Sequence, residues 1–549
     1  MNQFVNIAQG LKTAAENFPF KRAVVYPVSR DKNNRVTYSQ ITFEQLNKGS
    51  DEIAFGFEKI GIKRGTRTIL MVTPSIEFFY VIFAMIKIGA VPVVVDPGMG
   101  IKRMLSCLKQ GRPEAFIGIE KAHVLRTFSP NTFKSIKVWV TIGKRWFWGG
   151  HTLKGIWKQR DEQYRIAKTT FNETAAIVFT TGSTGPAKGV VYTHGNFAAQ
   201  VKQIKDHFKI KEDEIDLPTF PLFAMFDPGL AMTAVIPDMD PTKPARVNAK
   251  KIIEAIHNHG ITNMFASPAL LHRVGKYGKK NNIKLPSLRR VVSAGAPVSP
   301  SNIEQFSCML NKNTYIHTPY GATEAVPIVS IKSDEILSET KKLSEQGYGL
   351  CVGRPILNTK ILIIKIIDEP VSQLRDIHIL KDGEVGEIIV QAPLVTKQYF
   401  DNRKADLFGK IPDPSGEIWH RMGDVAWKDK DGRLWFCGRK NHRVETGEQT
   451  MFTIPCEAIF NKHEKVYRSA LVGVGKQGSQ IPVIFIEPFL NIKNKDKFFK
   501  ELASLADSFA HTKNITHFFI EKEFPVDIRH NSKIFREKLA IKAEKLLSK

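Results

Sequence analysis

The sequence has few cysteines, five among 549 residues, and they are widely separated. No two of them form a C-x-x-C pair, which argues against a zinc site, and their odd number argues against a disulfide framework. They are Cys107, Cys308, Cys351, Cys437 and Cys456. We therefore expect reduced thiols and a cytoplasmic protein.

The N-terminal residues lack the basic stretch and apolar core of a secretory signal, so we expect none. Signatures of zinc fingers, RNP motifs and helix-turn-helix units are also missing, which argues against nucleic acid as a partner. The net charge is nevertheless +26, from 80 basic and 54 acidic residues. We interpret this excess as a solvated, lysine-rich surface.

Long apolar runs without charges are absent as well. The most hydrophobic region, Thr68 to Asp96, contains Glu77 and Lys87 and divides into a strand, a helix and a second strand. We interpret it as a βαβ crossover with a buried helix, and not as a membrane span. Later stretches repeat the alternation, with a helix over Ala249 to His259 and a strand over Ile261 to Ser267. The pattern predicts an α/β fold with doubly wound sheets.

The character of the sequence changes after Cys437, where a polar, charged joint is followed by short strand patterns and two lysine-rich helical patterns. We predict two domains: a large N-terminal domain, residues 1–437, and a small, mobile α+β domain, residues 438–549. Residues Ser338 to Gly349 are mostly polar and predict a loop.

Residues 138–158 interleave four tryptophans with lysine and arginine; these are Trp139, Trp146, Trp148 and Trp157. Such a segment is compatible with peripheral contact with a membrane surface or with a partner protein. It is also compatible with a surface connection whose tryptophans pack on the domain, and we favour this second interpretation.

The stretch from Ala175 to Phe197 reads AAIVFTTGSTGPAKGVVYTHGNF. It predicts a buried strand, a loop, and a helix for which Asn196 is the N-cap. Glycine allows the backbone to approach an anion closely, while hydroxyls and a lysine add donors. The loop therefore predicts a phosphate-binding device. Its candidate residues are Thr180, Thr181, Gly182, Ser183, Thr184, Gly185 and Lys188.

The loop sequence T-T-G-S-T-G-P-A-K-G differs from a Walker A motif in the spacing of its glycines. It resembles the signature loop of the adenylate-forming superfamily, which includes acyl-CoA synthetases, luciferases and the adenylation domains of peptide synthetases. Further motifs of this superfamily follow in order along the chain. The resemblance implies activation of a carboxylic acid by ATP and Mg²⁺.

Two of these motifs are similar to the family's nucleotide-binding turns. The segment Ser293 to Pro297 resembles the turn that lines the adenine pocket, which implies contacts from Gly295, Ala296 and Pro297. The segment TPYGATE matches the pattern Y-G-x-T-E. The resemblance implies that Tyr320 and Gly321 lie near adenine, Thr323 at the α-phosphate and Glu324 on Mg²⁺, for which carboxylate oxygen is a suitable ligand.

Two later motifs complete the set. The segment WHRMGD resembles the family's T-G-D motif, which implies that Asp424 accepts from the ribose hydroxyls, with Arg439 nearby at the ribose or phosphate. The segment HNSKIFR resembles the C-terminal motif that carries the family's catalytic lysine, which implies that Lys533 bridges the acyl carboxylate and the α-phosphate. Lys533, Glu324 and Thr181 are the expected catalytic residues.

The acyl pocket is expected in PTFPLFAMFDPG, residues 218–229, where Phe220, Phe223 and Phe226 offer an apolar lining. Asp227 is the candidate for orienting a substrate hydroxyl. This segment, with GYGLCVGRP and HNSKIFREKL, resembles the β-lactone synthetases of bacterial long-chain olefin biosynthesis. The resemblance implies that a β-hydroxy fatty acid is adenylated and that its own hydroxyl then displaces AMP. It also implies an assembly with the pathway's reductase and decarboxylase.

Two alternatives stay open. One is a long- or medium-chain fatty acid–CoA ligase, which would use CoA in addition to ATP and Mg²⁺. The joint after Cys437 corresponds to the hinge of the family. It differs from the hinge pattern common in CoA ligases, because Asn441 stands in place of the usual Asp or Lys. This difference favours the reaction without CoA. The other alternative is a non-catalytic, basic surface-binding protein, which would leave the ordered motifs unexplained.

Overall fold

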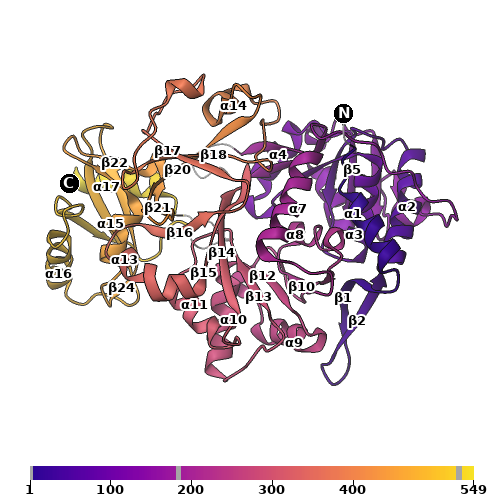
Figure 1. The fold of residues 1–549 in the computed structure, drawn as a ribbon, viewed down its shortest axis with the longest axis horizontal. Helices are drawn as coiled ribbons and strands as arrows, with labels where there is room; N and C mark the ends of the chain where they lie inside the picture. Colours follow the sequence, from indigo (N-terminus) through magenta and orange to yellow (C-terminus); the bar gives the residue numbers. More distant parts are fainter. Residues whose placement is uncertain (1–3, 181–186, 527–533, 549) are drawn as a thin grey trace.

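The structure, a computed structural model, describes residues 4–180, 187–526 and 534–548. The chain forms two large sheets and a smaller C-terminal sheet, and Figure 1 shows the N-terminal and C-terminal segments at opposite ends of the molecule. Among the described residues, no helix combines the length and the apolar character needed to cross a membrane.

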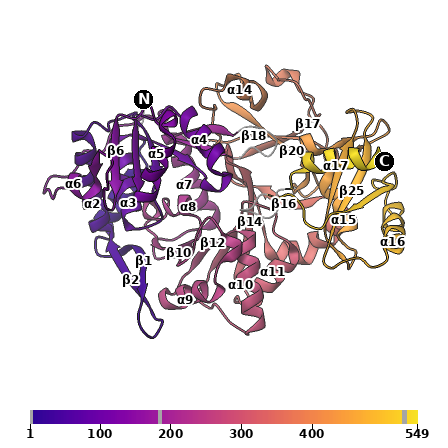
Figure 2. The same ribbon diagram turned by 180° about the vertical axis from the view of Figure 1, so that it is seen from behind.

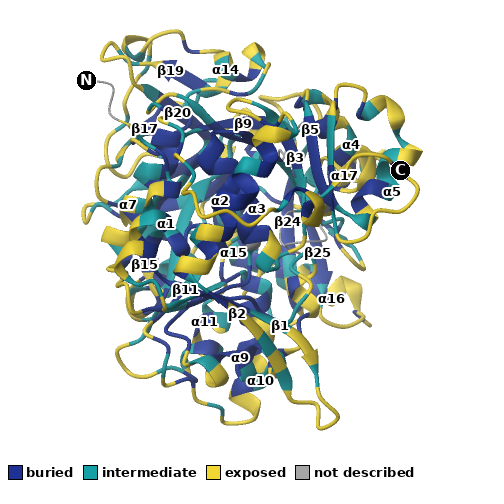
Figure 3. Cartoon of the chain, turned by 90° about the vertical axis from the view of Figure 1, so that its right-hand side faces the viewer, coloured by how far each residue is buried: buried dark blue, intermediate teal, exposed yellow. Residues whose placement is uncertain are grey.

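The expected βαβ crossover is present as β3 (Arg67–Met71), α3 (Ile76–Ile88) and β4 (Val91–Val95), and the two strands pair in parallel. The Ser75 side chain accepts from the backbone N–H of Phe78 at the start of α3, and Gly89 ends the helix with a left-handed φ of 73°. Every side chain of α3 from Phe78 onward is buried, and Figure 3 draws the helix in dark blue. The most hydrophobic region of the sequence is therefore a crossover whose helix lies in the core.

The first sheet is built around this unit from seven strands of the described chain, in the order β7-β6-β5-β3-β4-β8-β9. Helices α2, α4 and α5 connect or cover these strands. The remaining elements are α2 (Phe43–Lys59), α4 (Ile101–Gln110), β5 (Ala115–Ile119), α5 (Glu120–Phe128), β6 (Val138–Ile142), β7 (His151–Thr152), α6 (Leu153–Ile156), β8 (Thr174–Thr180) and β9 (Lys188–Thr193).

The phosphate-loop stretch differs from expectation in one respect. A second strand, β9, follows the loop and pairs with β8 in antiparallel register, with Thr180 opposite Lys188. Helix α7 (His194–Phe208) begins only after β9. Its N-cap is Thr193, and Asn196 closes a capping box three residues later, so the prediction of Asn196 as the N-cap was wrong. The loop therefore joins the strands of a hairpin.

The second sheet is longer, and it runs across the molecule in Figure 1. Its strands from β1 to β14, through β11, β10, β12 and β13, are parallel, whereas the strands beyond β14 are antiparallel. In spatial order they are β2 (Val36–Thr42), β1 (Arg22–Arg30), β11 (Thr233–Val235), β10 (Ile215–Pro218), β12 (Asn263–Ala266), β13 (Arg290–Ser293), β14 (Tyr315–Ala322), β15 (Ala325–Lys332), β16 (Leu350–Pro355), β21 (Leu434–Arg439), β20 (Ile418–Lys428), β18 (Gly386–Gln391) and β17 (Lys360–Ile364), with β19 (Lys410–Pro412) beside β20.

The two sheets are interleaved along the sequence. Strand β1 pairs with β11 in parallel, with Val24 opposite Ala234, and the whole first sheet is formed by residues that lie between them in the sequence. Further helices precede, connect or follow the strands of the second sheet. They are α1 (Ala8–Asn17), α8 (Pro221–Ala224), α9 (Ala249–His259), α10 (Pro268–Lys280), α11 (Pro300–Ser307), α12 (Ser333–Glu335) and α14 (Arg403–Gly409).

The C-terminal segment forms a separate three-stranded sheet with helices on both sides, visible in yellow in Figure 2. The helix α15 (Thr453–Phe460) and the helix α16 (Lys495–Asp507) bury Phe460 and Phe498 against one face, whereas α17 (Arg536–Leu547) buries Leu539 against the other. The strands are β24 (Val466–Val474), β25 (Ile481–Pro488) and β26 (His517–Ile520), preceded by the short pair β22 (Val444–Glu445) and β23 (Thr450–Met451). The α+β character predicted for this region is confirmed.

The prediction of a loop over Ser338 to Gly349 is wrong as far as Glu345. A π-helical turn, Ile336–Thr340, and the helix α13 (Lys341–Glu345) occupy it. Leu343 packs against the buried core of the second sheet, and this tertiary contact orders a segment whose polar composition favours a loop.

The tryptophans of residues 138–158 divide into two groups. Trp148 is buried and donates from Nε1 to Thr141 Oγ1 at 3.1 Å, and Trp157 donates to Glu52 Oε2 at 2.6 Å. Trp146 is 56% exposed. The interpretation that the tryptophans pack on the domain therefore holds for Trp148 and Trp157 but not for Trp146.

Candidate active site

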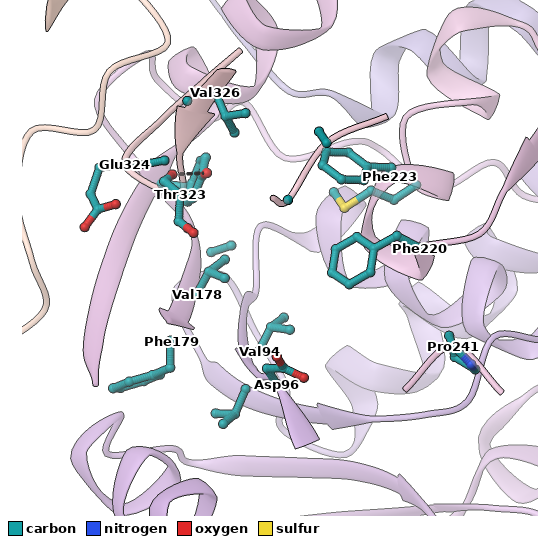
Figure 4. A pocket seen from close by; sticks show the side chains of 18 of the residues that line it. Val94, Asp96, Val178, Phe179, Phe220, Phe223, Pro241, Thr323, Glu324 and Val326 are labelled. Atoms are coloured by element: carbon teal, nitrogen blue, oxygen red, sulfur yellow. Dashed lines mark hydrogen bonds between the residues drawn. The ribbon is translucent and has the colours of Figure 1, made fainter. Parts of the chain in front are cut away.

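A cavity of about 1760 Å³ lies at the carboxyl ends of the central strands and reaches to the C-terminal segment. Ligands of open α/β sheets bind at this edge, where strand order reverses. In Figure 4, Phe220 and Phe223 point into the cavity from one side, opposite Thr323 and Val178. One wall of the cavity is therefore aromatic.

Three residues from separate motifs meet beside the cavity; of the three, only Arg439 is among its described lining residues. The phenolic O–H of Tyr320 donates to Asp424 Oδ2 at 2.6 Å, and Arg439 Nη1 lies 2.9 Å from Asp424 Oδ1. Asp424 and Arg439 are opposite one another on β20 and β21. Burial raises the pKa of Tyr320 well above its ordinary value, and Asp424 raises it further, so Tyr320 stays a donor at neutral pH. The carboxylate of Asp424 is thus held by one hydrogen bond and one ion pair.

Glu324 lies at the turn between β14 and β15 and lines the cavity. Tyr399 donates its phenolic O–H to Glu324 Oε1 at 2.7 Å. Burial alone would raise the pKa of Glu324, but the nearby charge of Lys410 and the hydrogen bond from Tyr399 hold it below its ordinary value. Glu324 is therefore ionised at neutral pH, as a metal-binding carboxylate has to be.

The surroundings of Glu324 were not predicted. Lys410 is buried, which lowers its pKa to about 8, and its ammonium group donates to the backbone oxygen of Thr396. His420 is also buried, and its pKa falls to about 3, so it is neutral. In a chain with so many lysines, nothing in the sequence distinguishes the buried Lys410 from the exposed ones.

Lys188 follows the phosphate loop and lines the same cavity. Its ammonium nitrogen lies 5.1 Å from the centre of the Tyr399 ring, which itself contacts Glu324. Two backbone hydrogen bonds, Val191 N–H to Gln398 O and Phe400 N–H to Gly189 O, hold β9 against the Tyr399 segment. The lysine and the carboxylate that the sequence assigned to phosphate and metal are therefore close together.

Several of the expected site residues lie at the edge of the described part of the chain or outside it. Thr180 ends β8, opposite Lys188. The rest of the expected loop residues and the expected catalytic lysine lie outside the described residues; they are Thr181, Gly182, Ser183, Thr184, Gly185 and Lys533.

The turn expected to hold adenine lies partly at the cavity. Gly295 lines it and has a φ of 96°, which favours glycine, whereas Ala296 and Pro297 are not among the described lining residues. Gly321 and Thr323 also line it. A Cβ on Gly321 would lie 2.5 Å from the backbone oxygen of Ala325, so the hairpin requires glycine there.

The aromatic wall agrees with expectation. The rings of Phe220 and Phe223 are 5.4 Å apart, Phe223 lies 4.5 Å from Phe265, and Phe226 also lines the cavity. Short helix α8 carries Phe223 and follows directly on Phe220. Apolar rings on one wall provide the contact surface that an acyl chain needs.

Asp227, expected to orient a hydroxyl, is placed elsewhere. It is not among the described residues that line the cavity, and its carboxyl is buried in hydrogen-bonding contact with that of Asp216 on β10. Burial, reinforced by Asp216, raises the pKa of Asp227 well above its ordinary value. The carboxyl of Asp227 is therefore engaged with Asp216 inside the domain, and we correct the expectation that Asp227 contacts substrate.

Residues of the joint form the far end of the cavity. Lys440 Nζ lies 3.2 Å from Glu387 Oε2, and Arg443 pairs with Asp368 at 2.5 Å. Gln477, from the C-terminal segment, also donates to Asp368, at 3.3 Å. Side chains on both sides of the joint thus line one cavity.

Comparison with known proteins agrees with this geometry. The family model described as AMP-binding enzyme matches residues 11–400. Over 559 aligned residues the chain is 41% identical to the olefin beta-lactone synthetase of Stenotrophomonas maltophilia, covering all of both chains. It is 22% identical to a 2-succinylbenzoate–CoA ligase of Bacillus cereus, covering 81% of this chain and 83% of the ligase.

The fold is also that of solved enzymes. The structure of the O-succinylbenzoate coenzyme A synthetase of Bacillus subtilis, in complex with ATP and magnesium ion, superposes with a TM-score of 0.73 at 20% identity. The match covers 96% of this chain and 98% of that one.

Proposed function

The chain belongs to the AMP-binding enzyme family, and from this membership we propose that it adenylates a long-chain β-hydroxy fatty acid and converts the acyl adenylate to a β-lactone. The single observation that carries the proposal is the 41% identity, over the full length, to an olefin beta-lactone synthetase. The products are AMP, pyrophosphate and the lactone.

In the first step, the acid's carboxylate oxygen attacks the α-phosphorus of ATP and pyrophosphate leaves. We assign ribose binding to Asp424, which Tyr320 and Arg439 hold in place. We assign the α-phosphate to Thr323 and the other phosphates to Lys188 with the loop that precedes it. Lys533 is the proposed cation at the carboxylate and α-phosphate, because a point charge there stabilises the charge that develops.

The residues present fit a magnesium ion at Glu324. Its carboxylate lines the cavity beside Lys188 and is kept ionised by its neighbours, and hard cations prefer carboxylate oxygen. Magnesium supplies charge neutralisation on the phosphate oxygens when it is bound. Tyr399 fixes the orientation of the carboxylate by donating to one of its oxygens.

In the second step, the β-hydroxyl oxygen attacks the acyl carbonyl carbon. The carbon–oxygen bond to AMP breaks, the hydroxyl loses its proton, and a four-membered ring closes. A hydroxyl held beside the carbonyl has an effective molarity of up to about 10⁵–10⁸ M. The wall formed by Phe220, Phe223 and Phe226 excludes water, which would otherwise hydrolyse the adenylate.

The alternative is a fatty acid–CoA ligase that forms the same adenylate and then a thioester. One experiment separates the two: the enzyme is incubated with ATP, Mg²⁺ and a long-chain β-hydroxy acid, with and without CoA, and the products are identified. We expect lactone and AMP without CoA. Acyl-CoA that accumulates only with CoA, with no lactone, would establish the ligase instead.

The third possibility, a non-catalytic binding protein, does not agree with membership of an enzyme family. Assembly with a reductase and a decarboxylase of the same pathway remains part of the proposal, as does a cytoplasmic location. The low identity to a CoA ligase, 22%, gives that activity less support.

A further inference from the structure

A loop of exposed aromatic and basic residues lies beside one end of the cavity, and we propose that it docks the enzyme on an anionic lipid bilayer. The loop joins β6 to β7, and its exposed residues are Lys144, Arg145, Trp146 and Phe147, here called the aromatic tip. The bilayer would supply the long acyl chain. That role rests on the proposed function, whereas the docking itself does not.

The aromatic tip exposes two large aromatic rings to solvent. Trp146 is 56% exposed and Phe147 is 79% exposed. Phe128, at the end of α5, is 81% exposed. Aromatic rings flanked by Lys and Arg are typical of residues that lie at the boundary between lipid headgroups and acyl chains.

The aromatic tip is held firmly by its neighbours. Trp148, directly after it, is buried and stacks on His123 with ring centres 5.5 Å apart. The backbone N–H of Lys144 donates to Glu120 Oε1 at 2.7 Å, and Arg145 donates to the backbone oxygen of Gly150. Because the loop is ordered by these contacts, docking would cost little conformational entropy.

Charge complementarity selects the partner. Residues 121–160 contain nine lysines and arginines and no aspartate or glutamate. All of these cations except Arg126 are exposed. The neighbouring carboxylate, Glu120, is engaged by the backbone of Lys144. The two cations of the aromatic tip, Lys144 and Arg145, are attracted to anionic lipid headgroups, with a gain for each basic residue near the membrane.

Helix α5 connects the aromatic tip to the cavity. One side of the helix lines the cavity through Ala122 and Leu125, while His123 packs on Trp148 and Arg126 donates to the backbone oxygen of Gly149 at 3.3 Å. Figures 2 and 3 show α4 and α5 side by side. Ile101 of α4 also lines the cavity and is 63% exposed, so the apolar lining reaches the surface here.

The test is co-sedimentation of the full-length enzyme with vesicles, without substrate. We expect binding to vesicles that contain phosphatidylglycerol, weaker binding to pure phosphatidylcholine, and a loss of binding at high salt. Each basic residue near an anionic surface contributes about fivefold, so Lys144→Ala with Arg145→Ala should weaken binding roughly 30-fold. Trp146→Ala with Phe147→Ala should weaken binding to both vesicle types.

The matched control is Phe489→Ala with Leu490→Ala, which removes exposed apolar side chains from the C-terminal segment and should leave vesicle binding unchanged. Turnover of a short, soluble β-hydroxy acid should be normal in every variant, which shows that each is folded. Wild-type protein that ignores anionic vesicles, or tip variants that bind as wild type does, would overturn the proposal. Vesicle binding without turnover of any acid would instead count against the proposed function.

Discussion

Tyr320 donates its phenolic O–H to Asp424 at 2.6 Å, although 104 residues separate them in the sequence. The contact joins the tip of β14 to the middle of β20, two strands that belong to different parts of the long sheet. The carboxylate that we assign to ribose is thereby oriented before any nucleotide arrives. Such preorganisation reduces the entropy that binding would otherwise lose.

Tyr320→Phe should therefore raise the KM for ATP. A hydrogen bond to a charged group contributes roughly 1.5–3 kcal/mol, so an increase of about tenfold or more is expected, with a smaller change in kcat. Steady-state kinetics at saturating acid measure both constants. The matched control is Tyr348→Phe, because Tyr348 is 50% exposed. An unchanged KM in the Tyr320 variant would show that the contact has no part in nucleotide binding.

Glu324→Gln should raise the concentration of Mg²⁺ needed for activity. The substitution keeps the size of the side chain and removes the charge that the hard cation prefers. Titration of turnover with Mg²⁺ measures the effect. Glu304→Gln is the control, because its carboxylate pairs with Lys341 at the surface. The same Mg²⁺ requirement in both variants would argue that Glu324 is only a structural residue of the hairpin.

Lys533→Ala should suppress AMP formation and leave nucleotide binding largely intact. Loss of one electrostatic contact to the developing charge costs roughly 10²–10³ in rate, by analogy with oxyanion donors. Pyrophosphate release reports the rate, and a fluorescent ATP analogue reports binding. Lys538→Ala, five residues further on, controls for the loss of a positive charge. Near-normal turnover would remove Lys533 from the mechanism.

The free energy of unfolding should depend on pH through the protonation of His317. Burial, together with His207 and Lys332, lowers its pKa to about 4, below the value of about 6.5 expected in the unfolded chain. The unfolded state therefore binds more protons between these pH values, so stability is full above pH about 6.5 and falls as the pH drops toward 4. At pH 5 this group alone should cost about 2 kcal/mol.

The measurement is urea unfolding of the wild type and of His317→Gln at pH 7.5 and pH 5. The variant should lose less stability between the two pH values, whatever its stability at pH 7.5. The exposed His151, replaced in the same way, is the matched control. An equal pH dependence of wild type and His317→Gln would contradict the assignment.

Sequence patterns were sufficient to predict those elements whose structure is determined by residues close together in the sequence. The βαβ unit around α3, the helix over Ala249–His259 and the strands of the C-terminal segment follow from apolar periodicity and from capping residues. The motifs also singled out Glu324 and Arg439, which both line the cavity, and Asp424, which pairs with Arg439; their roles in binding stay predictions. Asn196 was placed in the right helix but in the wrong capping position, because Thr193 and β9 precede it.

Contacts between distant segments could not be read from the sequence. Asp227 resembles a substrate-binding residue until the structure shows that its carboxyl is buried beside that of Asp216. Lys410 and Tyr399 complete the surroundings of Glu324, yet neither belongs to a motif that we recognised. The order of α13 depends in the same way on where Leu343 packs.

The pairing of β1 with β11 has a consequence for the order in which the protein folds during synthesis. Val24 pairs with Ala234, so β1 must wait for more than 200 residues to leave the ribosome before its parallel neighbour exists. The first sheet, in contrast, is encoded in one uninterrupted stretch that emerges meanwhile. Contacts of long sequence separation form slowly because the intervening chain must first be closed into a loop. The nascent chain should therefore acquire the first sheet as an early folded unit, with the second sheet closing around it later.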